Sequence, residues 1–126
     1  MSDIQEHPAV KKFVKELNSG TVALVLLSII ERGGKPLYGY EIAKQLERSS
    51  DGELPMKRGT LYPVLRSMEE QGLLKSEVEP SVTGPPRKYY SITGEGRTAL
   101  AAWKQMWLRT RGFVDSALEL GGDQDD

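Results

Sequence analysis

The stretch that decides the fold is residues 57–74, "KRGTLYPVLRSMEEQGLL". Its apolar residues recur at intervals of three and four positions, which predicts an amphipathic helix packed against a core through Leu61, Val64, Leu65 and Met68. Gly72 is expected to close the helix, because glycine is common just beyond a helix C-terminus. The opposite face carries Gly59, Tyr62, Pro63 and Arg66. The helix is therefore predicted to present a nearly flat outward surface at its N-terminal end.

The proline and the glycine suit a helix whose first half meets an anionic partner. If the helix begins near residues 58–60, Pro63 lies in or just beyond the first turn, where the amide hydrogen it lacks has little to bond. Gly59 removes a side chain and lets backbone amides approach a phosphate, while Lys57 and Arg58 supply positive charge. This polarity is what a helix needs if its N-terminal half enters a groove of nucleic acid.

Each of these residues also has a simpler interpretation. Pro63 can be an ordinary first-turn proline, Tyr62 a packed aromatic, and Arg66 the partner of Glu70 one turn later. For any one residue alone the simpler interpretation is the better one. The functional interpretation depends on the combination with a basic hairpin that follows.

The segments upstream of this stretch are predicted to be helical. Residues 10–17 form a short amphipathic helix, an arm that ends at the Asn-Ser-Gly break of residues 18–20. Residues 21–31 are apolar almost all round, which predicts a helix at the centre of the domain. Residues 40–49 follow a segment rich in glycine and place their apolar side chains on one side of a second core helix.

Downstream, "LLKSEV" and "RKYYSI" alternate apolar and polar residues as strands do, and "EPSVTGPP" between them reads as a hairpin loop. Two prolines stiffen the end of the loop and place Arg87 and Lys88 at its base. Basic residues on a projecting hairpin usually meet the DNA backbone or the minor groove. Thr93 then caps a long helix that runs from Gly94 to about Leu120.

This order of elements predicts an α+β fold, mostly α: a winged helix-turn-helix whose third helix enters the major groove. The chain divides into an N-terminal helical arm, a DNA-binding domain, a C-terminal dimerisation helix and an acidic tail, at residues 1–19, 20–92, 93–120 and 121–126.

Composition narrows the function further. All 17 Lys and Arg fall within residues 1–112, which gives this part a formal charge of +4, whereas the remainder carries −5. A mildly basic body permits an anionic partner without demanding one. The chain has no cysteine and one histidine, His7, and no paired base and nucleophile, so that we expect no enzyme, metal or cofactor. The longest apolar run is about half a membrane span and no secretory signal precedes it, which predicts a cytoplasmic protein.

The motifs "LYGYEIAKQL", "KRGTLYPVLRSMEEQGLL" and "GPPRKYYSITGEGR" resemble, in order and spacing, stretches of the PadR family of transcriptional regulators, and together they cover roughly residues 20–100. The resemblance implies a winged-helix repressor that binds a palindromic operator as a homodimer, with much of the dimer contact made by the long C-terminal helix. It carries over to Tyr38, Tyr40, Gly59, Thr60, Leu61, Tyr62, Pro63, Arg66, Gly84, Arg87 and Lys88.

The chain departs from the family pattern at two points. Arg58-Gly59 stands where members often carry Ser-Pro or Pro-Gly, which shifts the expected start of the helix by up to about a residue. A single helix follows the hairpin, as in the smaller subfamily, and this leaves the dimer to that helix and the N-terminal arm.

Two rival functions are compatible with parts of the sequence. "GEGRTA" at residues 94–99 matches a dinucleotide-binding motif, but the short remainder after Asp115 offers no apolar strand for the parallel sheet that such a site needs. The stronger alternative keeps the fold and changes the function to a protein-interaction module, because a net charge of −1 is a weak signal for DNA binding.

The last helix carries a heptad seam, which predicts a homodimer with twofold symmetry. The expected interface comprises Leu100, Trp103, Met106, Trp107, Thr110 and Val114, with Val10, Phe13 and Leu17 of the arm. Trp103 and Trp107 lie one turn apart on this helix. Tryptophans at this spacing are commonly packed anchors; alternatively, and in line with the ligands of some PadR-like regulators, they line a pocket for a planar aromatic effector. Trp107 is then expected to face the ligand.

Overall fold

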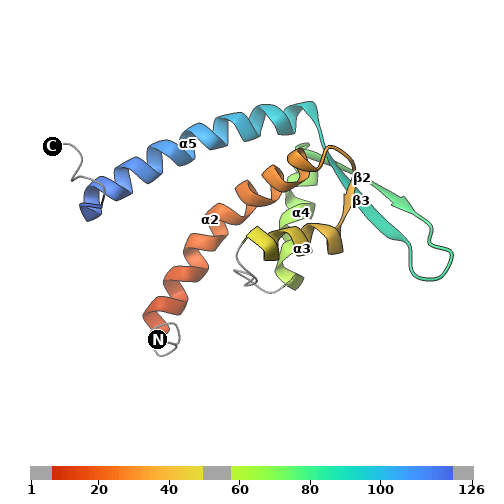
Figure 1. The fold of residues 1–126 in the computed structure, drawn as a ribbon, viewed down its shortest axis with the longest axis horizontal. Coiled ribbons are helices and arrows are strands. Elements are labelled where there is room, and N and C mark those ends of the chain that lie inside the picture. Colours follow the sequence, from red (N-terminus) through yellow and green to blue (C-terminus); the bar gives the residue numbers. More distant parts are fainter. Residues whose placement is uncertain (1–6, 50–57, 121–126) are drawn as a thin grey trace.

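The computed structural model describes residues 7–49 and 58–120, and its mostly helical architecture confirms the predicted fold class. A small antiparallel sheet lies at one end of the molecule, and the long helices α2 and α5 diverge toward the other (Figure 1). In chain order the elements are α2 (Pro8–Gly33), β1 (Leu37–Tyr38), α3 (Gly39–Ser49), the 3-10 turn η1 (Arg58–Thr60), α4 (Leu61–Glu70), β2 (Leu74–Glu79), β3 (Arg87–Ile92) and α5 (Gly94–Leu118).

The sheet contains one strand more than the sequence predicts. Strands β2 and β3 form the expected hairpin, with Leu74 opposite Ile92 and Glu79 opposite Arg87. The two-residue strand β1 pairs with the other edge of β3, which gives the order β1-β3-β2. A strand this short leaves too little alternation to detect in a sequence. It places Tyr38 beside the base of the hairpin.

The core forms where α2, α3 and α4 meet beneath the sheet. The predicted core face of α4 is confirmed, since Leu61, Leu65 and Met68 are buried and Val64 packs against them. The second half of α2 supplies the centre of the core, as its all-round apolar sequence predicts. The largest fully buried side chains are Leu26, Leu27, Ile29, Ile42, Leu61, Leu65 and Met68.

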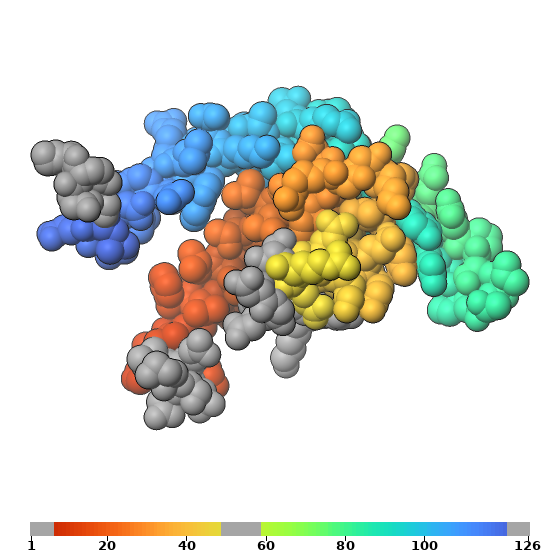
Figure 2. Space-filling model, viewed as in Figure 1, coloured from red at the N-terminus to blue at the C-terminus, as the bar shows by residue number. Residues whose placement is uncertain are grey.

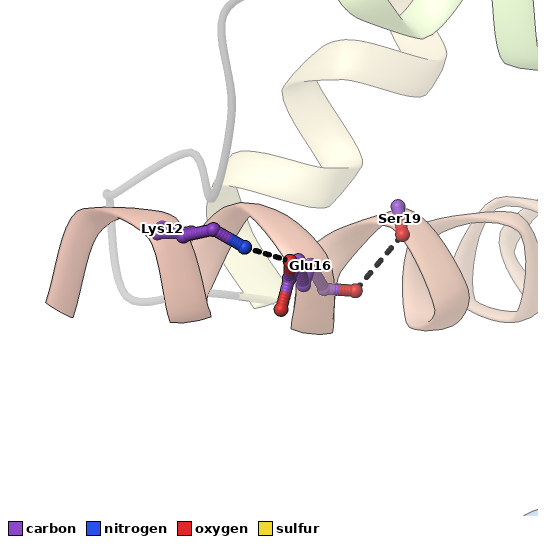
Figure 3. Close-up of polar contacts among 3 residues, drawn as sticks. All are labelled: Lys12, Glu16 and Ser19. Atoms are coloured by element: carbon purple, nitrogen blue, oxygen red, sulfur yellow. Dashed lines mark hydrogen bonds and ion pairs between the residues drawn. The ribbon is translucent and has the colours of Figure 1, made fainter. Parts of the chain in front are cut away.

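The predicted break between an arm and the core helix is wrong, because α2 runs without interruption through residues 18–20. The Ser19 hydroxyl donates to the carbonyl of Glu16 at 2.9 Å, as Figure 3 shows, and the Thr21 hydroxyl donates to the carbonyl of Leu17 at 3.1 Å. Hydroxyls bonded to the preceding turn are compatible with a helix interior, and one glycine costs only about 1 kcal/mol relative to alanine. The segment called the arm is therefore a rigid extension of the core helix.

Helix α2 is also long and apolar enough to cross a membrane, by length and composition alone. Core helices of soluble proteins pass the same test, so one such helix is weak evidence for a membrane span; 28% of the apolar window is buried here. Its ends are well defined: the His7 ring accepts a hydrogen bond from the Ala9 amide at 3.1 Å, and Gly34 ends the helix in the left-handed conformation. The single histidine thus acts as a helix cap.

The turn after α4 is joined directly to the first turn of α5. Gly72 has a φ of 83°, which glycine adopts without strain. The Thr93 hydroxyl donates to the Gly72 carbonyl at 2.6 Å and accepts from the Gly96 amide at 2.9 Å, so that one side chain serves both elements. A side chain at Gly96 would overlap the carbonyl of Leu73. The close approach fixes how α5 leaves the domain.

Candidate nucleic-acid interface

The outward face of α4 has the geometry that the sequence predicts. Tyr62, Pro63 and Arg66 are exposed, while the residues between them are buried or half-buried. Pro63 is the third residue of the α-helix and so stands in its first turn. Within the described residues Arg66 makes no ion pair with Glu70, so the simple helix-surface pairing is not formed. Arg66 is presented to solvent.

The start of α4 is preceded by the 3-10 turn η1, whose first residue is Arg58. Gly59 is exposed and faces open space, with nothing within 4 Å of the position of an added Cβ. Thr60 occupies the N-cap position but its side chain caps no backbone amide. Lys57 lies outside the described residues. The Thr60 side chain therefore satisfies none of the backbone amides in the first turn of α4.

Tyr62 connects α4 to the start of α3, a contact that the sequence did not reveal. A Cβ placed on Gly39 would lie 2.5 Å from the Tyr62 ring, so the ring rests on the backbone of Gly39. Tyr62 is nevertheless 41% exposed. One edge of the ring therefore packs, as the simpler interpretation predicts, while the rest faces solvent.

An aromatic cluster continues this surface to the base of the hairpin. The rings of Tyr38 and Tyr40 stack with centroids 6.2 Å apart, and Tyr38 also contacts Tyr89 at 5.5 Å. The Arg87 guanidinium lies 4.6 Å from the centre of the Tyr38 ring. The pKa of Arg87 is raised, first of all by its hydrogen bond to Tyr89. We call the exposed face formed by Tyr38, Tyr40, Tyr62, Pro63, Arg66 and Arg87 the reading surface.

The second basic residue of the hairpin points the other way. Arg87 and Lys88 are neighbours in β3, so their side chains lie on opposite faces of the sheet. The Lys88 Nζ is 3.3 Å from Glu69 Oε1 of α4 and 5.4 Å from the centre of the Tyr90 ring. Lys88 is thus paired within the domain and is not brought together with Arg87.

Glu69 also accepts a hydrogen bond from the Ser76 hydroxyl, at 2.5 Å. This bond is the main reason why the pKa of Glu69 lies below its usual value of 4.5, and the Lys88 ammonium acts in the same direction. Burial is the largest influence on Lys88 and lowers its pKa, but the Glu69 and Tyr90 side chains outweigh it and the net pKa is raised. Both members of the ion pair are therefore charged at neutral pH.

The remaining predicted DNA contact, Gly84, is exposed in the loop that joins β2 and β3. We call this hairpin with its loop, residues 74–92, the wing. Figure 2 shows the wing projecting on the side opposite to the diverging ends of α2 and α5. Sequence reasoning missed Gly39, Glu69 and Tyr89, although strand alternation already places Tyr89 on the same face as Arg87.

The predicted dimer surface is largely exposed, with one correction. Leu100 is 3% exposed and belongs to the core of its own domain, because α5 packs there against the domain before it leaves it; it is not available to a second copy. Trp103 is half-buried against the same core. The exposed or half-exposed predicted residues are Val10, Phe13, Leu17, Met106, Trp107, Thr110 and Val114.

A groove of about 490 Å³ lies between α2 and α5, where the two helices begin to diverge. Both tryptophans line it, and Trp107 is 39% exposed whereas Trp103 is packed more deeply. The remaining walls are mostly apolar and include Leu17, Gly20, Leu24, Met106 and Thr110. The groove therefore has the aromatic and apolar lining typical of sites for small organic molecules.

Comparison with known proteins places these features in a family. The model of the transcriptional regulator PadR-like family matches residues 26–102, more than half of the chain. The crystal structure of a PadR family transcriptional regulator from Eggerthella lenta is similar over 88% of this chain and 93% of that one, with 37% identity and a TM-score of 0.74. A transcriptional regulator from Clostridium thermocellum gives 28% identity and a TM-score of 0.71 over 80% of this chain and 96% of that one.

A relative in Mycobacterium tuberculosis described as a probable transcriptional regulator is 29% identical over 79 residues, which is 63% of this chain and 40% of that protein.

Proposed function

This chain belongs to the PadR-like family of transcriptional regulators, and we propose that it is a repressor that binds a palindromic operator as a homodimer and is released by a small aromatic effector. Members of this family are DNA-binding regulators and not enzymes, in agreement with the sequence prediction. Such regulators are typically soluble and cytoplasmic, and we propose the same location for this chain.

The observation that carries the DNA-binding proposal is the continuity of the reading surface. Tyr62 of α4 rests on Gly39, which stands between Tyr38 and Tyr40, and Tyr38 holds the Arg87 guanidinium of the wing. These contacts link the helix proposed for the major groove to the base of the wing. In this arrangement Arg66 reaches base edges and Arg87 meets phosphate or the minor groove. Arg58, Gly59 and Thr60, which precede α4, contact the phosphate backbone of the DNA, and so does Lys57.

Binding to duplex DNA at several salt concentrations tests this proposal. DNA enriched by the protein from a randomised pool should bind with an affinity that falls steeply as salt rises, because neutralised phosphates release counterions. Arg66→Ala should cost about 1–3 kcal/mol on the enriched duplex and much less on random duplex. Lys104→Ala, which removes an exposed charge from α5, serves as the matched control and should have little effect. Absence of salt-dependent binding by the wild type would instead favour a protein-interaction module.

The dimer proposal is supported by the apolar side chains that α2 and α5 expose. Phe13, Leu17, Met106, Phe113 and Val114 are each more than 40% exposed. Large apolar side chains on diverging helices are costly in water and are typical of surfaces that bind another protein. A second copy related by a twofold axis would cover both helices and place its recognition helix in the second half-site.

The effector proposal is supported by the groove beside this surface. In a dimer, Trp103 and Trp107 of both copies would approach one another near the axis, and an indole is a good stacking platform for a flat aromatic molecule. Planar hydrophobic dyes should quench tryptophan fluorescence saturably at micromolar concentration. Trp107→Ala should abolish saturable quenching of the remaining Trp103 while sedimentation still shows a dimer. No saturable quenching across a varied panel of aromatic compounds would reduce both tryptophans to dimer packing.

A further inference from the structure

We propose that Lys88 is a positioning residue for DNA binding: with Glu69 and Ser76 it holds the wing against α4, so that the helix and Arg87 approach DNA as one rigid unit. We call these three residues the wing clamp. The inference rests on the proposed role of the reading surface. It assigns to Lys88 a role different from the phosphate contact that the sequence predicts.

The clamp joins three separate elements through one carboxylate. Glu69 lies one residue before the end of α4, Ser76 lies in β2 and Lys88 lies in β3. One Glu69 oxygen accepts from Ser76 at 2.5 Å and the other is 3.3 Å from the Lys88 ammonium. Because both hairpin strands contact the same side chain of the helix, the two contacts oppose changes in the tilt and twist of the wing.

The surroundings of Lys88 hold it in this position. Its ammonium lies over the ring of Tyr90, which is 3% exposed and forms part of the core. Strand alternation places Lys88, Tyr90 and Ile92 on the face of β3 that packs against the domain. A lysine on this inner face, with its charge matched by Glu69, is poorly placed to bind a phosphate.

The energetic contribution of the clamp to folding is expected to be small. The side chains of Lys88 and Glu69 are 40% and 32% exposed, and partly exposed ion pairs contribute little to the free energy of unfolding. Arg87 is the residue next to Lys88 in β3 and therefore moves with its backbone. A small change in the wing angle is therefore expected to alter DNA contacts more than it alters stability.

Replacement of the carboxylate gives the sharpest test, because the clamp and simple electrostatics predict opposite signs. Removing a negative charge close to DNA should strengthen binding if charge alone matters. If Glu69 holds the wing, Glu69→Ala should weaken binding to the enriched duplex, by about fivefold for a contact of roughly 1 kcal/mol. Glu70→Ala is the matched control: the neighbouring carboxylate is exposed and outside the clamp, and its loss should leave affinity unchanged or slightly higher.

Lys88→Met completes the test through the salt dependence of binding. The clamp predicts weaker binding at every salt concentration with an unchanged slope, since no phosphate contact is lost, whereas Arg87→Met should reduce the slope by about one. A slope reduced by Lys88→Met would overturn the proposal, as would stronger binding by Glu69→Ala. The proposal also fails if both variants lower the melting temperature but bind DNA normally well below it. Failure of the wild type to bind DNA is a different result and would reject the proposed function itself.

Discussion

The two halves of α2 differ sharply although they form one continuous helix. The second half is enclosed by its own chain, with Leu26, Leu27 and Ile29 fully buried, whereas the first half exposes Phe13 and Leu17 to solvent. Helix α5 shows the same division, because its first turns pack on the domain and its later turns expose apolar side chains. The difference teaches that the core and wing are specified within one copy, while the outer halves of both helices expose apolar side chains that the proposed second copy would cover.

The largest expected effect concerns the outer half of α5. Phe113→Asp should remove an apolar side chain from each copy of the interface, at a cost of about 1.5–3 kcal/mol per side chain, without unfolding the monomer. Sedimentation equilibrium should show dissociation at micromolar concentration while the far-ultraviolet circular dichroism is retained. Lys104→Asp is a control on the exposed surface of the same helix. A wild-type protein that sediments as a monomer at this concentration would contradict the proposal that a second copy covers the outer half of α5.

The domain core should respond in the opposite way. Leu65→Ala should lower the free energy of unfolding by about 2–5 kcal/mol, because Leu65 is fully buried and its truncation leaves a cavity. Denaturant unfolding at a fixed protein concentration measures the change. Phe113→Ala, measured at a protein concentration low enough for the protein to be monomeric, should lower the free energy of unfolding far less. Equal losses for both truncations would mean that the outer half is covered by its own chain.

Two glycines beside the reading surface, Gly39 and Gly59, differ in how closely they are packed. Gly39→Ala should destabilise the protein by no more than about 1 kcal/mol, because the added methyl group overlaps the far edge of the half-exposed Tyr62 ring, which can move aside. Gly59→Ala meets open space and should leave stability unchanged or slightly higher. Tyr62→Ala combined with Gly39→Ala should relieve the first effect. Thermal unfolding of the wild type, the two single variants and the double variant measures these effects. A melting temperature lowered by Gly59→Ala but not by Gly39→Ala would contradict the predicted packing of Tyr62 on Gly39.

The smallest effect concerns pH. The folded pKa of Glu69 is lowered by Ser76 and Lys88, so its contribution to stability is present above the usual pKa of 4.5 and is lost as pH falls through the folded value. Lys88 and Ser76 face the carboxylate, and Tyr90 faces Lys88. Glu69→Gln should therefore be less stable than the wild type at neutral pH by no more than about 1 kcal/mol, and this gap should narrow in acid. A stability difference between the two proteins that does not change with pH would show that Glu69 is not held as an anion.

Periodicity predicted the elements of the domain because each one has a buried face. The core face of α4, the central helix and the hairpin could all be found in this way. The continuity of α2 could not, since Asn18, Ser19 and Gly20 are typical of a break and only the hydroxyl bonds to the preceding turn show that the helix tolerates them. Local sequence does not record whether such a polar side chain bonds within a helix or ends it.

For the candidate site, the sequence predicts the exposure of residues more successfully than it predicts the contacts between them. Tyr62, Pro63 and Arg66 follow from the helical repeat alone. The pairing of Lys88 with Glu69 depends on how the wing folds back on α4, and the contact of Tyr62 with Gly39 depends on how α3 crosses it. Both are contacts between elements distant in sequence, and neither leaves a local pattern. The apolar seam of α5 predicts Leu100 at the dimer interface because one seam packs on the domain at the start of the helix and continues along its exposed part.

The junction at Thr93 has a mechanical consequence. Helix α5 has 25 residues, about 37 Å at 1.5 Å per residue, and its first turn is fixed to the turn that ends α4. A rotation of about 5° at this junction would displace the far end of α5 by about 3 Å, given that length. The ratio works in both directions: in the proposed dimer, a shift of a few ångströms at the far end of α5 would become a rotation of a few degrees at α4. Close packing at Gly96 leaves little slack to absorb such a rotation before it reaches the DNA.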